Sequence, residues 1–231
     1  MSTLTRQQIE AQIQAQGSGL SLENQDLSGL DLANLELSGS NFSGANLSGA
    51  NLKNSQLREA NFSQANLEGA NLSDANLSKS NFNEARFKEA ILTNAYLLKA
   101  NLTQVNLSGI KLVKAKLDEV MLSGANLAGA DLDRAYAVRG DFREANLSRA
   151  NLPEVNFKDA NLSGANLQGA NMQATFLEKA NLCGADLRGA NLKEAQLRLA
   201  EYDEQTRWEP GFDPAGAGAV RKKKKKWLGL F

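Results

Sequence analysis

Leucine or phenylalanine recurs at every fifth position of the chain from Leu22 to Leu197. The series has 36 members without an insertion or deletion, and only Ala137 and Met172 are neither leucine nor phenylalanine. A small residue, most often alanine, stands two positions before each member, and Asn or Asp stands directly before it in 24 of the 36 cases. A period of five does not match the 3.6-residue period of an amphipathic helix, so the pattern argues against helices.

Each five-residue unit contains two inward-facing positions and one corner. Residues two apart on an extended chain point to the same side, so the small residue and the Leu or Phe can both face a core. The next inward residue comes three positions later, which requires the chain to turn once per unit. A strand that turns every five residues with one face inward must coil, and successive coils then pair in parallel.

The phenylalanines indicate how many units make one coil. Four of them differ by multiples of 20, namely Phe42, Phe62, Phe82 and Phe142. This spacing indicates four units per coil, although Phe87 and Phe157, which also stand at centres, lie outside the column. The series then predicts about nine coils and a column roughly 43 Å long, at ~4.8 Å between paired strands.

The repeated unit also carries a family resemblance. The motif Ala-Asn-Leu-Ser-Gly stands intact at 45–49 and at 160–164. It resembles the repeat of pentapeptide-repeat proteins, and the resemblance covers residues 20–202. It implies an all-β solenoid, a right-handed quadrilateral parallel β-helix with four pentapeptides per coil. The segment 202–214 is also similar to the closing segment of cyanobacterial members.

Four regions follow from this reading: an N-terminal capping helix at 1–19, the repeat body at 20–202, a C-terminal cap at 203–214, and a flexible linker with a polybasic tail at 215–231. A solenoid must cover its terminal coils, which otherwise expose apolar side chains and unpaired strand edges. Three aromatic residues of the C-terminal region are expected to fold over the last coil: Tyr202, Trp208 and Phe212. With both ends covered, we expect a monomer.

The capping helix is expected at residues 5–16. Thr5 and Gln8 have the spacing of a capping box, and Ile9 and Ile13 lie four positions apart on one face. The first coil carries leucine at several positions where later coils carry alanine. We therefore expect the two isoleucines to pack against this enlarged apolar end.

The overall charge of zero hides an uneven distribution. Residues 27–200 are neutral, residues 201–220 are acidic, and residues 221–226 are all basic. The predicted contacts of this tail are Arg221, Lys222, Lys223, Lys224, Lys225, Lys226, Trp227 and Phe231. Each basic residue contributes about 1 kcal/mol near an anionic membrane, and an aromatic end suits the headgroup layer. An acidic protein partner fits the tail equally well, and nucleic acid is the less favoured partner.

Groups suited to catalysis are scarce in the sequence. It contains no histidine, and its one cysteine, Cys183, has no partner for a disulfide or a nucleophilic pair. Neither a phosphate-binding loop nor a dinucleotide fingerprint occurs in a suitable context. We expect no enzyme activity, no cofactor and no metal site. Without a long apolar run or the apolar core of a signal peptide, we expect a cytoplasmic location, with peripheral contact to a membrane through the tail.

The departures from the repeat are more informative about function. Tyr96, Tyr136 and Phe176 occupy the position at which Asn or Asp is usual, and each lies 40 residues from the next. With 20 residues per coil they share one face, to which Leu98 and Val138 also belong. Basic residues are expected around them: Lys79, Lys99, Lys116, Arg139, Lys158 and Lys179. Exposed aromatics in a basic surround are typical of a partner-binding surface. The alternative is simple drift in a degenerate part of the repeat.

Two functions of different classes follow. The first is a non-catalytic scaffold that presents this face to a protein partner, with the tail as a tether. The alternative is a modulator of DNA gyrase, because the resemblance includes family members that imitate duplex DNA. Mimicry requires a strongly negative surface, since the phosphate array dominates what DNA-binding proteins recognise. The neutral body and the basic C-terminus count against it.

Overall fold

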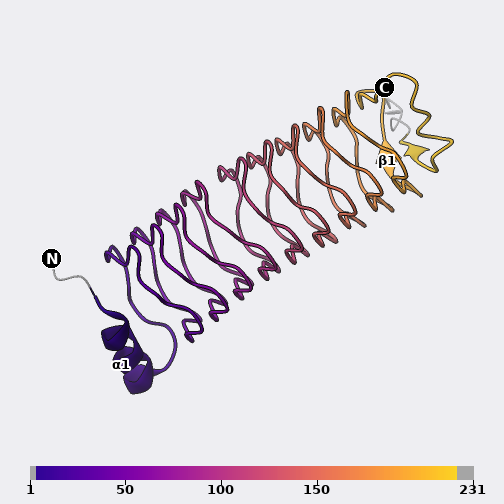
Figure 1. Ribbon diagram of the computed structural model, residues 1–231. Helices are drawn as coiled ribbons and strands as arrows, with labels where there is room; N and C mark the ends of the chain where they lie inside the picture. Colours follow the sequence, from indigo (N-terminus) through magenta and orange to yellow (C-terminus); the bar gives the residue numbers. More distant parts are fainter. Residues whose placement is uncertain (1–3, 223–231) are drawn as a thin grey trace, which may run out of the picture.

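The computed structural model describes residues 4–222, which form a column of stacked coils (Figure 1). The named elements lie at the two ends: helix α1 at Arg6–Gln16, and strands β1 at Glu201–Tyr202 and β2 at Val220–Arg221. Between them the chain makes parallel bridges between residues 20 apart, from Ser21 with Asn41 to Asn181 with Glu201. Four five-residue units therefore complete one coil, and equivalent units stack along the column axis.

The hydrogen bonds of one unit explain its composition. In residues 45–49, the first amide N–H closes a turn inside the coil (3.0 Å), and the second donates to the preceding coil (2.9 Å). The third and fifth donate to the following coil (2.7 and 2.8 Å), and the fourth donates to the side-chain Oδ1 of Asn46 (3.3 Å). Every amide thus has an acceptor, as burial of a backbone requires.

The residue before each centre forms a second ladder on the outside. Asn66 donates from Nδ2 to Oδ1 of Asn46 (3.1 Å), which donates in turn to Asp26 (3.0 Å). An Asn at this position therefore accepts a backbone N–H and also joins its neighbours in the coils above and below. This double role explains the frequency of Asn, because each such bond stabilises the fold by about 0.5–1.5 kcal/mol.

The core is filled by the Leu and Phe centres together with the small residues two positions before them. Leu47 and Ala45 are fully buried, as are their equivalents along most of the column. Phe42, Phe62 and Phe82 form a stack with ring centroids 4.8 and 5.1 Å apart. This stack is the column that the 20-residue spacing predicts. Because side chains fill the column axis, a partner can bind only at the outer faces.

One face contains a break in the inter-coil ladder. Within residues 4–222, five neighbouring amides lack the backbone acceptor that their equivalents have: Glu84, Phe87, Glu89, Asn106 and Lys111. The corresponding bonds of the coils on either side are normal, for example 2.8 Å from the Leu67 N–H and 2.7 Å from the Leu107 N–H. A cavity of about 370 Å³ opens here between the two coils.

Excess side-chain volume explains the break. Phe82 and Phe87 are adjacent centres of one coil and lie tilted at 58° with centroids 5.3 Å apart. The coil above places Val105 over Ala85, where most coils have alanine. Overfilling a close-packed core forces the backbone to shift.

A second pair of phenylalanines in one coil is accommodated without a break. Phe142 and Phe157 meet edge to face at 5.1 Å. Ala137 lies beneath Phe157, and Gly140 faces Phe142, whose ring atom Cε2 would be only 2.6 Å from a Cβ at that glycine. These two small residues provide the space that the coil of Phe87 lacks.

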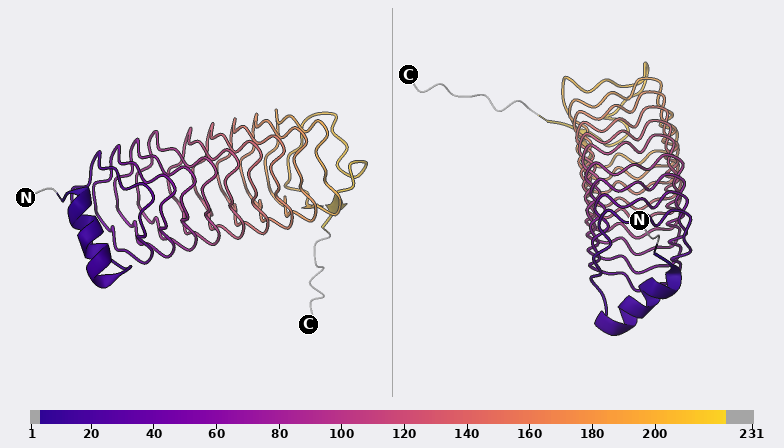
Figure 2. Two further views of the ribbon diagram at one scale, coloured as in Figure 1. Left: turned by 60° about the horizontal axis from the view of Figure 1, so that its bottom comes forward. Right: turned by 90° about the vertical axis from the view of Figure 1, so that its left-hand side faces the viewer.

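Helix α1 lies across the first coil, at the end of the column opposite β1 (Figure 2). Thr5 is its N-cap and forms a capping box with Gln8. Ile9 is fully buried and Ile13 packs against the core, while Arg6 donates to the backbone carbonyl of Asp31 at 2.8 Å. The helix thereby covers the enlarged apolar end of the solenoid.

The C-terminal segment covers the other end. Tyr202 and Phe212 each contact Trp208, with ring centroids 5.6 and 5.3 Å apart. Strand β2 pairs in parallel with β1, and Val220 donates its amide to the carbonyl of Ala200 at 2.8 Å.

The structure differs from the flexible linker predicted at 215–220. The amides of Ala217, Gly218 and Ala219 all donate to carbonyls of residues 213–215. Ala219 is buried, and the carbonyl of Gly218 accepts from the Leu199 amide at 2.8 Å. The last coil has no following coil to pair with, so this segment supplies its backbone partners. Within residues 4–222, no helix has the length and apolar character needed to cross a membrane.

Candidate functional site

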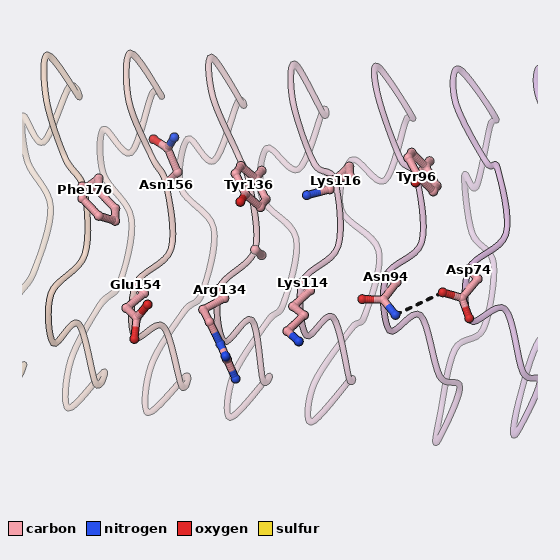
Figure 3. Close-up of a pocket in the computed structure, with 11 residues that line it drawn as sticks. Asp74, Asn94, Tyr96, Lys114, Lys116, Arg134, Tyr136, Glu154, Asn156 and Phe176 are labelled. Atoms are coloured by element: carbon pink, nitrogen blue, oxygen red, sulfur yellow. Dashed lines mark hydrogen bonds between the residues drawn. The ribbon is translucent and has the colours of Figure 1, made fainter.

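An open groove of about 650 Å³ runs along one corner of the column (Figure 3). Its floor is a row of side chains from the position before the centre, in successive coils: Tyr96, Lys116, Tyr136, Asn156 and Phe176. Its wall is a row of turn residues from the adjoining unit: Asp74, Asn94, Lys114, Arg134 and Glu154. The 20-residue coil aligns both rows with the column axis. We call this feature the aromatic groove.

The three aromatic side chains of the floor are largely exposed. Tyr96, Tyr136 and Phe176 have 51%, 45% and 39% of their surface accessible. Lys116 stands between the tyrosines and places its Nζ 3.5 Å from the ring centroid of Tyr136. This cation–π contact holds the lysine over the floor. The floor is therefore an apolar strip with one positive charge near its middle.

Residues of the groove floor also interrupt the outer ladder of Asn side chains. Within residues 4–222, the amides of Leu98, Asp118 and Glu178 have no acceptor, because Tyr96, Lys116 and Phe176 have no side-chain oxygen in place of Oδ1. The floor thus replaces stabilising hydrogen bonds, each worth about 0.5–1.5 kcal/mol, with exposed apolar surface.

The predicted face contains two further apolar residues. Leu98 is 40% exposed, whereas Val138 is half-buried and donates its amide to Oδ1 of Asp118 at 3.2 Å. Both follow the same centres as the aromatics but lie outside the groove lining. The structure thus brings Tyr96, Tyr136 and Phe176 together in one groove and places these two beside it.

Most of the basic residues predicted around the aromatics are paired with acids outside the groove. Lys79 contacts Glu59 at 3.1 Å, while Lys99 and Arg139 both contact Glu119, at 3.2 and 2.8 Å. Arg139 and Lys99 together lower the pKa of the Glu119 carboxyl below its usual range. Of the predicted basic residues, only Lys116 lines the groove.

The positive charges of the groove wall are Lys114 and Arg134, which the sequence analysis missed. Arg134 contacts its neighbour Asp133 at 2.8 Å, whereas Lys114 has no ion pair within residues 4–222. The signal was available: both precede a floor residue by two positions and occupy the outward turn position of their unit. Acids flank them in the same row, Asp74 on one side and Glu154 on the other.

The comparison with protein families follows directly from the repeat. The model of pentapeptide repeats matches in eight copies, over residues 18–54, 55–94, 70–109, 100–136, 141–178 and 166–200. The chain belongs to the pentapeptide-repeat family. Its fold is accordingly the right-handed four-sided β-helix of that family. A comparison with curated proteins finds no match.

Three solved structures are similar to the chain to different degrees. HetL, a pentapeptide-repeat protein involved in heterocyst differentiation regulation from Nostoc sp. strain PCC 7120, is 32% identical over 85% of this chain and 96% of its own, with a TM-score of 0.43. A protein of the Arabidopsis thaliana thylakoid lumen is 31% identical over 50% of this chain and 66% of its own, with a TM-score of 0.28. QnrB1, a plasmid-mediated fluoroquinolone resistance protein, is 16% identical over 89% of both chains, with a TM-score of 0.54, and shows the fold alone.

The pentapeptide-repeat protein offers little for catalysis in its described part. Within residues 4–222, no three His, Cys, Asp or Glu side chains are grouped to hold a metal ion. Burial raises the pKa of the Cys183 thiol, which disfavours the reactive thiolate.

The predicted tail falls partly outside the described residues. Lys223, Lys224, Lys225, Lys226, Trp227 and Phe231 lie beyond them. Arg221 belongs to β2, and Lys222 contacts Glu201 at 2.8 Å, which raises the pKa of the lysine. These two residues are therefore part of the C-terminal cap.

Proposed function

We propose that this pentapeptide-repeat protein is a non-catalytic scaffold that binds a protein partner through the aromatic groove. The observation that carries the proposal is the exchange of three Asn-type positions for exposed Tyr96, Tyr136 and Phe176 along a single line. Positions that break a local rule without a gain in stability are expected at functional sites. Exposed aromatic side chains in a concave strip are also the composition of binding hot spots.

Drift of the repeat does not account for this arrangement equally well. Met121 also stands directly before a centre, but on another face, and it is the most exposed large apolar residue at this repeat position outside the groove. Drift would scatter such residues over the four faces, whereas the aromatics occur on one face at intervals of two coils. The wall adds Lys114, Arg134 and their flanking acids, which give the groove a defined charge order.

The tail extends the proposal. The basic, aromatic-ended segment would tether the scaffold to an anionic membrane surface or an acidic partner, in the cytoplasm and as a monomer. The composition of residues 223–231 supports this part, together with the attachment of Arg221 and Lys222, the residues next to them in the sequence, to the C-terminal cap.

A gyrase-directed function has weaker support. The likeness to QnrB1 concerns the fold alone, and DNA mimicry needs a negative surface. Acids and bases on this column are paired in many places, as for Glu119 and Glu178. A gyrase supercoiling assay tests the alternative, and we expect no inhibition or protection at concentrations that saturate the partner.

Affinity purification tests the proposed function. The triple variant Tyr96→Asn, Tyr136→Asn and Phe176→Asn restores the residue type of the repeat and should fold normally, with the same circular dichroism spectrum. We expect it to lose the partners that the unchanged chain retains. Met121→Asn, at the same repeat position on another face, is the matched control and should retain them. Equal recovery of partners by the triple variant and the control would contradict the proposal.

A further inference from the structure

We infer that the occupant of the aromatic groove is an amphipathic α-helix of the partner, acidic in its middle turns and basic toward its ends. This inference rests on the proposed function and adds the chemistry of the partner. It is carried by two observations: the spacing of the floor aromatics and the order of charges along the wall. An extended strand and a second copy of this chain are the competing occupants.

The spacing of the floor matches a helix better than a strand. Tyr96, Tyr136 and Phe176 repeat every two coils, or about 9.6 Å at ~4.8 Å per coil. Seven residues of a helix advance about 10.5 Å and return to the same face, so one helical stripe meets all three aromatics in turn. A strand advances about 10 Å in three residues, which turns its side chain to the opposite face. An extended peptide therefore cannot present equivalent side chains to successive aromatics.

The length of the groove also suits a helix of ordinary size. The lining runs from the coil of Asp74 to the coil of Phe176, five coil steps or about 24 Å along the axis. A helix of about 16 residues covers this distance at 1.5 Å per residue. Helices that dock in grooves use one apolar stripe of this kind.

The wall specifies the charges of the helix. Lys114 and Arg134 are one coil apart on the wall, and Lys116 belongs to the floor, so three cations line the middle of the groove. Asp74 lies two coils from Lys114, and Glu154 lies one coil from Arg134 on the other side. Acids on the middle turns of the helix and bases toward both ends complement this order. A second copy of α1 does not, because its sequence, RQQIEAQIQAQ, carries a single acid.

The unequal spacing of the charges also gives the helix a direction. Two coils correspond to six or seven helical residues, and one coil corresponds to three or four. Read from the Asp74 end of the groove, the complementary helix has a basic residue first and an acid about seven positions later. A second acid follows about three positions after that, and a second basic residue about four positions later still. Reversing the helix moves the longer interval to the wrong end of the groove.

Fluorescence anisotropy with synthetic peptides tests this inference on the full-length chain. The first probe is an alanine-rich helical peptide with this charge pattern and leucines on the stripe that faces the floor. The second peptide has the same composition, but acids stand where the first has bases, and bases stand where the first has acids. The third is the first with a proline at its centre, which breaks the helix.

We expect the first peptide to bind about tenfold more tightly than the second, which corresponds to two partly exposed ion pairs gained and two repulsions avoided. The preference should disappear in the double variant Lys114→Glu and Arg134→Glu. It should persist in Arg149→Glu, which reverses a basic residue at the same turn position on another face. The proline peptide should lose most of its affinity.

Each other outcome overturns the inference. Equal binding of the first and second peptides, or an unchanged preference in the double variant, removes the charge argument. Full affinity of the proline peptide identifies an extended occupant, and self-association of the chain that the aromatic substitutions abolish identifies a second copy. If no peptide binds but the triple aromatic variant still loses its partner, the helix is wrong and the proposed function stands.

Discussion

The overfilled coil at Phe87 leads to a prediction that reverses the usual effect of trimming a core residue. Phe87 is buried beside Phe82 and below the coil of Val105, and the ladder between these coils is open at five amides. Phe87→Leu removes the excess volume while keeping an apolar centre. Leucine is the residue that the other faces of the column use most, so we expect the two coils to close.

The magnitude follows from the hydrogen bonds. Five backbone bonds at about 0.5–1.5 kcal/mol each would stabilise the closed form by about 2.5–7.5 kcal/mol. Loss of ring contacts and some residual space offset about 1–3 kcal/mol of this. The midpoints of these two ranges leave a net increase of about 3 kcal/mol in the free energy of unfolding. Phe157→Leu is the matched control, because Phe157 is equally buried in a coil whose ladder is intact, and it should lower the free energy of unfolding by about 1 kcal/mol.

Denaturant unfolding and amide hydrogen exchange measure the two consequences. In the unchanged chain, the amides of Phe87 and Asn106 should exchange much faster than those of Leu67 and Leu107, which are bonded to the next coil. In Phe87→Leu they should become protected. If Phe87→Leu destabilises the fold as much as Phe157→Leu and these amides continue to exchange rapidly, overfilling is not the cause of the break.

Three further predictions concern the ends of the column. Ile9→Ala should lower the free energy of unfolding by about 2–5 kcal/mol in denaturant titrations, because this buried side chain covers the first coil, whereas a change at exposed Gln14 should have little effect. The Arg188 guanidinium lowers the pKa of Asp186 to about 2, so its stabilising contribution is complete above pH 4 and is lost as pH falls toward 2. The stability difference between the unchanged chain and Asp186→Asn should shrink over that range, and a constant difference would contradict this. Full-length protein should co-sediment with anionic vesicles more than a chain ending at Lys222, and equal sedimentation would remove the membrane role.

Much of the architecture could be predicted because one physical rule is repeated many times. The spacing of centres from Leu22 to Leu197 is uninterrupted, so every coil repeats the same register. The 20-residue spacing of Phe42, Phe62 and Phe82 predicted four units per coil, and these three rings stack in the structure. The capping box of Thr5 is equally local, since it depends on residues within one turn. Patterns of this kind require no knowledge of distant contacts.

Features that depend on neighbouring coils were harder to predict. The position of Lys114 and Arg134 in the groove wall becomes visible only when two adjoining units are placed around a corner. The defined conformation of residues 215–220 was not predicted, because a run of Ala and Gly has the composition of a linker. The last coil nevertheless needs backbone partners, and small residues can approach it closely. The break at Phe87 depends on a sum of volumes in two coils, which no single unit reveals.

Site-specific photo-crosslinking in the cells that express the protein tests the central claim most directly. A photoreactive phenylalanine analogue replaces Tyr136 on the groove floor, and in a second chain it replaces Met121 at the same repeat position on another face. We expect a discrete cross-linked partner from position 136 that is lost when Lys114 and Arg134 are both changed to Glu, and none from position 121. Equal adducts from both positions, or adducts from position 121 alone, would contradict a binding function for the aromatic groove.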